Sequence, residues 1–290
     1  MIPASFEYFS PKTLAEAIAL LQQHGSDAKI LAGGQSLIPL MKLRMASPKR
    51  LIDLNRVNGL SYIKESDGFL TIGALTRESE IDGSELIHKK YPILADTAAV
   101  IGDPLVRNMA TVGGNLAHAD PANDHPATML ALGTEVVATG PKGARKIPIG
   151  EFFTDLFTTS LKPDEILTEI RIPIPPARSG GAYLKVERKV GDFAAAAVAV
   201  QITLDGNNVK KVGIGLTNVG PTPIKASRAE KALQGKPAEQ KNIEEAARIA
   251  SEEAQPVDDL RGSADYKRSL VRVLTVRALQ KAIARAKGEH

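Results

Sequence analysis

Two short segments of this chain each contain a pair of adjacent glycines followed by an amide side chain. The first glycine segment, residues 31–36, reads Leu-Ala-Gly-Gly-Gln-Ser, and the second glycine segment, residues 110–115, reads Ala-Thr-Val-Gly-Gly-Asn. Glycine lets the backbone turn sharply and lets a ligand approach main chain that a Cβ would otherwise cover. Successive backbone N–H groups at such a turn form a concave site suited to phosphate. One such segment favours a structural turn, but two predict that both close on a single pyrophosphate.

The standard nucleotide-binding motifs are missing from this chain. No G-x-G-x-x-G joins a predicted strand to a helix, and no G-x-x-x-x-G-K-[ST] occurs. The sequence Gly213-Ile214-Gly215 falls inside a predicted strand, and we interpret it as sheet geometry. The glycine segments therefore predict a dinucleotide-binding protein that lacks the usual nucleotide motif.

Composition excludes several kinds of chemistry. The chain has 290 residues, enough for two domains, and it has no cysteine. Disulfides, thiolate nucleophiles and thiolate ligation of an iron–sulfur cluster are therefore excluded, and any such cluster must belong to another chain. The net charge is only +4. The densest basic stretch, residues 272–287, alternates with apolar residues at helical spacing, which indicates a solvated helix face and no nucleic-acid site.

The order of predicted elements indicates an α+β protein. The N-terminus has no secretory signal pattern and no apolar run reaches the roughly 18 residues of a membrane span, so we expect a cytoplasmic protein. A helix is predicted to begin at Ser10-Pro11 and to end at Gly25, and Thr76 is predicted to cap a short helix. Hairpins are predicted around residues 66–68 and 140–143. Other elements are predicted as strands at 6–9, 29–32, 50–54, 166–172, 182–189, 194–204 and 209–217, and as helices at 93–100, 126–132, 226–233, 238–254 and 264–287.

A polar block follows the second glycine segment. Residues 115–126 read Asn-Leu-Ala-His-Ala-Asp-Pro-Ala-Asn-Asp-His-Pro. An exposed loop is one interpretation, and a metal site made of His118, Asp120, Asp124 and His125 is another. The spacing fits no common metal template, so we predict no metal. We favour a ligand wall in which Asp124 accepts hydrogen bonds from a chain of hydroxyl groups.

Several segments of the chain together resemble a known family. They are the two glycine segments, the NLAHADPANDHPA block, the leading FEYFSP, the MKLR after the first segment, and Lys185 followed by Gly191-Asp192-Phe193. The chain is similar, over its whole length, to the FAD-binding medium subunits of carbon monoxide dehydrogenase and related molybdenum hydroxylases, the xanthine dehydrogenase family. The resemblance implies a vanillyl-alcohol-oxidase-like (PCMH-type) FAD-binding fold at residues 1–177, with subdomains of about 1–57 and 58–177. It implies a C-terminal α+β domain at residues 178–290, with a three-stranded antiparallel sheet and helices.

The resemblance also implies where FAD binds. Asp124 matches the family acid that contacts the sugar-alcohol chain of the flavin, and Lys185 matches a lysine near the cofactor, with a surface lysine as the alternative. Ile166 or Leu167 matches an apolar residue near the rings. Phe193 stands where the family often has a tyrosine that covers the flavin, and core packing is its alternative. The predicted cofactor-binding residues are Leu31, Ala32, Gly33, Gly34, Gln35, Ser36, Leu37, Ala110, Thr111, Val112, Gly113, Gly114, Asn115, Asp120, Asp124, Ile166, Lys185 and Phe193.

The implied function is that of an electron-transfer subunit without catalytic residues of its own. Partner chains would hold the molybdopterin (large subunit) and two [2Fe–2S] clusters (small subunit), in a dimer of heterotrimers resembling carbon monoxide dehydrogenase or aldehyde oxidoreductase. Electrons would leave FAD for an external acceptor, and peripheral contact with a quinone-reducing membrane is left open. Gln35 and Phe193, where carbon monoxide enzymes often have His and Tyr, weaken carbon monoxide as the substrate. A stand-alone flavin oxidase and a nonenzymatic nucleotide-binding module remain alternatives.

A first mutational expectation follows from the two glycine segments. We expect Gly33→Val and Gly114→Val to abolish flavin retention with only modest loss of fold, because a branched side chain would stand where the phosphate lies.

Overall fold

The computed structural model describes residues 2–289 and begins with a small parallel sheet. Its strands lie in the order β1 (Glu7–Phe9), β3 (Arg50–Asp53) and β2 (Ala28–Leu31), and both pairs are parallel. Helix α1 (Leu14–His24) begins after Thr13, whose side chain accepts a hydrogen bond from the Glu16 N–H, and it ends at Gly25. The predicted end is confirmed, whereas the predicted start at Ser10-Pro11 is wrong because Thr13 supplies the cap.

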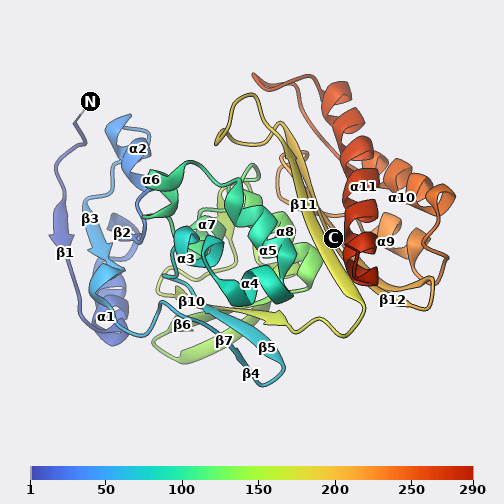
Figure 1. Cartoon of the computed structure of the whole chain (residues 1–290). Helices are drawn as coiled ribbons and strands as arrows, with labels where there is room; N and C mark the ends of the chain where they lie inside the picture. The colour runs from blue at the N-terminus through green and yellow to red at the C-terminus, as the bar shows by residue number, and fades with distance from the viewer. Residues whose placement is uncertain (1, 290) are drawn as a thin grey trace.

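A five-stranded antiparallel sheet follows. Figure 1 shows it beneath the green helices at the centre of the molecule. Its order is β4 (Ile63–Ser66), β5 (Phe69–Gly73), β10 (Ile166–Pro173), β6 (Glu135–Gly140) and β7 (Gly143–Pro148). Both predicted hairpins are confirmed, one joining β4 to β5 and the other joining β6 to β7. A separate short ladder pairs β8 (Phe153–Asp155) with β9 (Thr158–Thr159).

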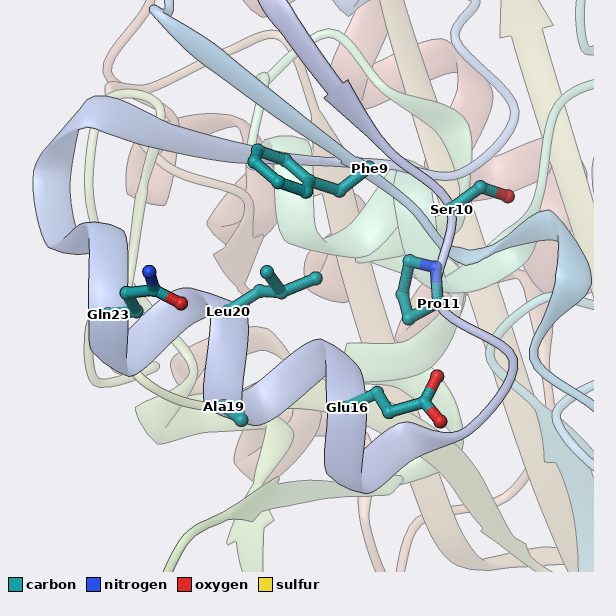
Figure 2. A pocket seen from close by; sticks show the side chains of 7 residues that line it. All are labelled: Phe9, Ser10, Pro11, Glu16, Ala19, Leu20 and Gln23. Carbon is teal, nitrogen blue, oxygen red and sulfur yellow. The ribbon is translucent and has the colours of Figure 1, made fainter.

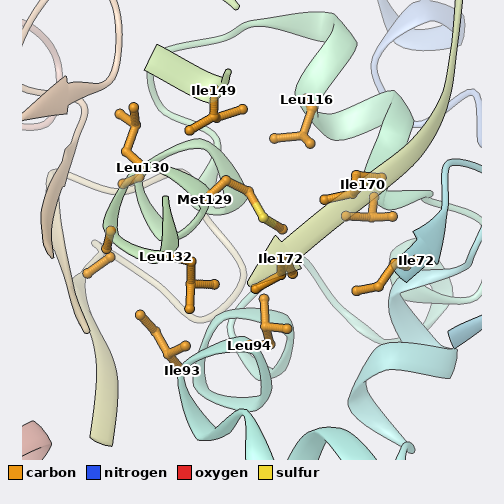
Figure 3. Close-up of a cluster of buried hydrophobic side chains, with 14 of the residues drawn as sticks. Ile72, Ile93, Leu94, Leu116, Met129, Leu130, Leu132, Ile149, Ile170 and Ile172 are labelled. Carbon is orange, nitrogen blue, oxygen red and sulfur yellow. The ribbon is translucent and has the colours of Figure 1, made fainter. Parts of the chain in front are cut away.

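Short helices cover this sheet and bury its apolar face. Met129 from the helical layer lies among Leu116, Ile170 and Ile172, as Figure 3 shows, and all four side chains are fully buried. The predicted helix over 126–132 forms and ends at Gly133, which has a left-handed backbone. Helix α2 (Leu37–Lys42) and the 3₁₀ turns at Gly25–Asp27 and Leu54–Arg56 belong to the N-terminal part of the chain. The later helices are α3 (Glu78–Asp82), α4 (Glu85–Lys90), α5 (Pro92–Ala99), α6 (Pro104–Arg107), α7 (Val112–His118) and α8 (Asp124–Leu132), with a 3₁₀ turn at Ile149–Glu151.

The C-terminal part of the chain is a second antiparallel sheet backed by helices. The three predicted strands form as β11 (Ser179–Val186), β12 (Ala196–Asp205) and β13 (Asn208–Thr217). The predicted number of strands is corrected, because β14 (Ile224–Lys225) pairs with β13 and makes the sheet four-stranded. The predicted helices form as α9 (Ser227–Leu233), α10 (Gln240–Glu253) and α11 (Ala264–Lys287).

This second sheet is covered on both faces. Figure 1 shows α10 and α11 on one side of β11, with α5 and α8 on the other. Helix α8 lies directly on β13, since an ideal Cβ on Gly213 or Gly215 would lie 2.0 Å from the carbonyl oxygens of Ala131 and Ala127. The interpretation of these glycines as sheet geometry is confirmed, and they allow the beginning of α8 to reach the side chains of β11.

The strand β11 shows the alternation expected of a buried strand. Ala182 belongs to the core shared with α10 and α11, and Leu184 packs against it, whereas Tyr183 belongs to the core shared with α5 and α8. Successive side chains of a strand point to opposite faces, so Tyr183 and Lys185 share the face directed at α8. No helix among residues 2–289 is long and apolar enough to cross a membrane.

Candidate functional site

The two glycine segments lie against each other. An ideal Cβ on Gly33 would lie 2.3 Å from the carbonyl oxygen of Met109, and one on Gly114 would lie 3.8 Å from the Cβ of Ala32. The sequence separates these segments, and the fold brings them into contact. The expectation that Gly33→Val leaves the fold largely intact is wrong, because the added side chain would meet neighbouring backbone rather than open space.

The first glycine segment has the geometry of an anion site. Gly34 has a positive φ of 75°, and Ser36 precedes α2 with a helical backbone. Within the described chain, the N–H groups of Gly34, Gln35 and Ser36 donate no hydrogen bond. Successive N–H groups in such a turn can converge on a phosphate. Gln35 is exposed and Ser36 half-buried, so a ligand can reach them from the surface.

The second glycine segment differs from the predicted turn. Gly113 and Gly114 form the first turn of α7, and the Thr111 hydroxyl accepts a hydrogen bond from the Gly114 N–H at 3.2 Å. The Val112 and Gly113 N–H groups donate to Thr76 and Ala74 carbonyl oxygens at 3.1 and 2.9 Å. The prediction that backbone N–H groups of both segments bind the pyrophosphate is therefore wrong for these three groups, which donate to acceptors within the chain.

A clamp of two side chains joins the glycine segments, and the sequence analysis missed it. The Asn55 side-chain amide donates to the carbonyl oxygen of Ala32 at 2.9 Å, and the Arg77 guanidinium donates to Asn55 Oδ1 at 2.5 Å. The same guanidinium donates to the carbonyl oxygen of Met109. No sequence pattern marks this pair, because the two residues meet only in the folded chain.

Asn115, the last residue of the second segment, contributes a hydrogen-bond acceptor. Its backbone oxygen accepts from the Asn123 side chain at 2.8 Å, which ties the end of the segment to the start of α8. Its side-chain Oδ1 is buried and has no hydrogen-bond partner among residues 2–289. Buried polar atoms are nearly always paired. This acceptor and the three amides of the first segment fit a ligand that carries both phosphate and hydroxyl groups, as FAD does.

Asp124 and Lys185 form a buried ion pair. Lys185 Nζ lies 3.1 Å from Asp124 Oδ2, and the lysine side chain is only 3% exposed. The alternative of a surface lysine is therefore wrong. Lys185 also donates to the Val100 carbonyl oxygen at 3.0 Å and lies 3.3 Å from Glu187 Oε2. Two of its three ammonium protons are donated, to Val100 and Asp124, whereas Glu187 Oε2 is a neighbouring charge that accepts no hydrogen bond among residues 2–289.

The Tyr183 hydroxyl donates to Asp124 Oδ1 at 2.5 Å. Burial raises the pKa of Asp124, and Lys185 and Tyr183 oppose that rise. Burial, together with the Asp124 charge, raises the pKa of Tyr183 far above its usual range, so the phenol stays a neutral donor. Tyr183 was not among the predicted site residues. Its position two residues before Lys185 on a predicted strand is the signal that could have found it.

The other predicted cofactor-binding residues lie in different parts of the fold. Phe193 is 41% exposed and lies 5.5 Å from the Arg261 guanidinium, so its core-packing alternative is wrong. Ile166 is buried in the N-terminal core cluster and Leu167 in the central one. Asp120 Oδ1 accepts a hydrogen bond from the Ala122 N–H at 2.9 Å.

The described residues contain no metal cluster, and a surface pocket in the N-terminal part includes none of the predicted site residues. Within residues 2–289, no three His, Cys, Asp or Glu side chains are grouped so that they could hold a metal ion. A pocket of about 410 Å³ lies between β1 and α1, where Figure 2 shows Phe9, Pro11 and Leu20. None of its lining residues belongs to the predicted set.

Comparisons with known proteins cover the whole chain. Residues 4–175 match the family model described as the FAD binding domain in molybdopterin dehydrogenase, and residues 181–282 match the CO dehydrogenase flavoprotein C-terminal domain. The carbon monoxide dehydrogenase medium chain of Afipia carboxidovorans is 44% identical and covers 99% of this chain and 100% of its own length.

Solved structures agree with the sequence comparisons. A carbon monoxide dehydrogenase structure from Hydrogenophaga pseudoflava has a TM-score of 0.96 and 46% identity, covering 98% of this chain and 99% of its own. Quinoline 2-oxidoreductase from Pseudomonas putida 86 has a TM-score of 0.92 and 33% identity, covering 99% of both chains. The two-subdomain flavin fold with a C-terminal α+β domain, expected from the sequence, is confirmed.

Proposed function

This chain belongs to the family of FAD-binding subunits of molybdopterin dehydrogenases, and on that premise we propose that it is the FAD-carrying, electron-transferring subunit of a heterotrimeric molybdenum hydroxylase. The similarity to medium chains of several such enzymes supports this proposal. The absence of cysteine agrees with it, because iron–sulfur clusters would have to lie in a partner. When bound, FAD would take up electrons from those clusters and release them to an external acceptor.

The contact between the two glycine segments is the observation that carries the proposed binding site. We propose that the N–H groups of Gly34, Gln35 and Ser36 donate to the pyrophosphate, while the α7 segment from Thr111 to Asn115 forms the opposing wall. The buried Asn115 Oδ1 would accept a hydrogen bond from the ligand. In this arrangement the chain binds and orients the cofactor and provides no acid or base for a substrate.

The rest of the predicted site is proposed on the family resemblance. Asp124 would accept from the sugar-alcohol hydroxyls, Lys185 would hold that carboxylate in place, and Phe193 would cover the rings. Ile166 and Asp120 would lie nearby, although in the described chain Ile166 packs in a core cluster and Asp120 is engaged in a turn.

The partners and domain limits are further proposals. We propose an iron–sulfur small subunit and a molybdenum large subunit, in a dimer of heterotrimers, and a domain limit at residues 177–178. The family models support that limit, since one ends at residue 175 and the other begins at residue 181. The outer limits, residues 1 and 290, lie outside the described residues. The cytoplasmic location and the alternative of a stand-alone flavin oxidase stay predictions of the sequence analysis.

The proposed function is tested by the flavin content of the protein purified with its partners. We expect one noncovalent FAD per chain, released on denaturation and measured by its absorbance. Gly114→Val should lose it, because the added Cβ would lie 2.7 Å from the Thr111 hydroxyl and the rest of the side chain would stand at the contact with Ala32. Gly150→Val is the matched control, since no atom lies within 4 Å of an added Cβ there. Colourless wild-type protein after incubation with FAD would contradict the function, and full flavin content in Gly114→Val would contradict the site.

A further inference from the structure

A buried tyrosine hydroxyl lies behind the proposed flavin site. The Tyr183 side chain is 3% exposed, and its hydroxyl donates to Asp124 Oδ1 at 2.5 Å. The only other contact of this hydroxyl among the described residues is Thr217 Oγ1 at 3.5 Å, which is at the limit of a hydrogen bond. The phenol therefore acts mainly on Asp124.

The backbone of Tyr183 is also fixed from outside the strand. Its N–H donates to Asp96 Oδ2 on α5 at 3.2 Å. Asp96 in turn accepts from Arg285 on α11, and Arg285 donates to the neighbouring Gly181 carbonyl oxygen at 2.6 Å. Helices from both sides of the sheet thus hold this part of β11, so the position of the phenol oxygen is set before any ligand binds.

Asp124 receives a different partner on each carboxylate oxygen. Tyr183 donates to Oδ1, and Lys185 donates to Oδ2 at 3.1 Å. Lys185 also donates to the Val100 carbonyl oxygen and lies 3.3 Å from Glu187 Oε2, whereas the Tyr183 hydroxyl has no second strong acceptor. Two donors at fixed positions determine the plane of a carboxylate and leave each oxygen one further lone pair.

From this geometry we propose that Tyr183 is a positioning residue, which holds the Asp124 carboxylate oriented and ionised so that it can accept hydrogen bonds from the sugar-alcohol hydroxyls of FAD. The inference rests on the proposed function. It extends that function, because it assigns a role to a residue that does not itself contact the cofactor.

The chain offers a matched control for the hydroxyl. Tyr91 is 1% exposed, and its hydroxyl also donates to a carboxylate, Glu65 Oε1, at 2.8 Å. Glu65 lies on β4 and belongs to no part of the proposed site. Tyr183→Phe and Tyr91→Phe therefore each remove one hydroxyl that is hydrogen-bonded to a carboxylate. Only the carboxylate bonded to Tyr183 belongs to the proposed flavin site.

The experiment compares these variants in the complex purified with its partners. FAD is removed and then titrated back, and binding is followed by flavin fluorescence. We expect Tyr183→Phe to weaken FAD binding about tenfold, because Asp124 would no longer be held in the binding orientation before FAD arrives. Tyr91→Phe should bind FAD as the wild type does. Equal FAD affinity in all three proteins, or an equal loss in both variants, would overturn the proposal.

The pH profile supplies a readout that a merely structural role would not move. The charged and titratable groups around Asp124 are Tyr183, Lys185, Glu187 and His125. Without the phenol donor, Asp124 should protonate at a higher pH, so acid release of FAD should begin at a higher pH in Tyr183→Phe than in wild type or Tyr91→Phe. An unchanged profile would contradict the proposal.

A double variant separates an effect that acts through Asp124 from a general loss of fold. Because Tyr183 is proposed to act through Asp124, Tyr183→Phe should have no further effect on FAD affinity in an Asp124→Asn background. Additive losses would overturn the role. A wild-type complex that binds no FAD would instead refute the proposed function, so the two failures can be told apart.

Discussion

The glycines of the proposed site are required for different structural reasons. Gly33 is required because backbone of residues 109–110 occupies the place of its side chain, and Gly113 because Ala74 does. Gly34 is required for its positive φ, which a β-carbon disfavours. Gly114 has the most space of the four, with its nearest contacts a hydroxyl and a methyl group. Even there, an added Cβ would lie 2.7 Å from Thr111 Oγ1, so a substitution has to displace the hydroxyl that caps α7.

Asp124 makes stability depend on pH. Burial raises its pKa above the usual value of 3.8, so the folded state holds the proton more tightly than the unfolded state. Between 3.8 and the folded pKa, this group therefore makes the free energy of unfolding fall as pH rises. Asp124→Asn removes that contribution. Urea unfolding measures the free energy of unfolding of both proteins across this pH range. The value for the wild type minus that for the variant should fall as pH rises, and a constant difference would contradict the raised pKa.

At the scale of elements, helix α7 and strand β13 both depend on contacts made by the backbone. Helix α7 begins at Val112 because the Thr111 hydroxyl caps it and because Ala74 and Thr76 carbonyl oxygens receive its first amides. The glycine pair therefore lies within a helix rather than in a free turn. Strand β13 accepts α8 at close range through Gly213 and Gly215. Together these contacts place the beginnings of α7 and α8 beside each other, joined by Asn115 and Asn123.

Gly215→Ala tests the contact between α8 and β13. The new methyl group would lie 2.0 Å from the Ala127 carbonyl oxygen, so the helix must move away from the sheet. We expect a loss of about 1–3 kcal/mol in the free energy of unfolding. Gly150→Ala, with open space at its Cβ, should change it by no more than about 1 kcal/mol. Urea denaturation measures both, and equal effects would show that α8 does not depend on this close approach.

In the whole molecule, β11 connects the flavin-binding part to the C-terminal part. Tyr183 belongs to the central core cluster, whereas Ala182 belongs to the C-terminal cluster. The side chain of Asp96 on α5 pairs with Lys281 and Arg285 on α11 at 3.1 and 2.6 Å, across the sheet edge. The residues proposed to face FAD thus depend on packing between parts of the chain that are distant in sequence.

Asp96→Asn should weaken this connection. The variant removes the charge that Lys281 and Arg285 share, and we expect a loss on the order of 2 kcal/mol, since the group is only partly buried. Hydrogen exchange should become faster in β11 and α11 together. Glu245→Gln is the control, because its pair with Arg248 is exposed and on one helix. Unchanged exchange in β11 would show that the ion pairs do not hold the strand.

The sequence predicted most of the elements but only part of the site. The hairpin at 66–68 and the end of the helix at Gly133 follow from local backbone preferences, which neighbouring residues alone determine. The start of α1 was misplaced because Ser10-Pro11 and Thr13 are both good capping signals, and only packing selects one. The clamp made by Asn55 and Arg77 left no trace in the sequence, because it depends on a contact between separate loops.

The amino-acid sequence by itself determined that this chain is an α+β protein without thiol chemistry, and it predicted two glycine segments at a phosphate and, through a family resemblance, FAD as the ligand. Those properties lie in local pattern and composition. Only the tertiary structure decided that Gly33 touches the second segment, that the α7 amides are already bonded, and that Tyr183, Asp124 and Lys185 form one buried group. Such contacts join residues far apart in the chain, and close packing of the folded core, which no local preference encodes, fixes them.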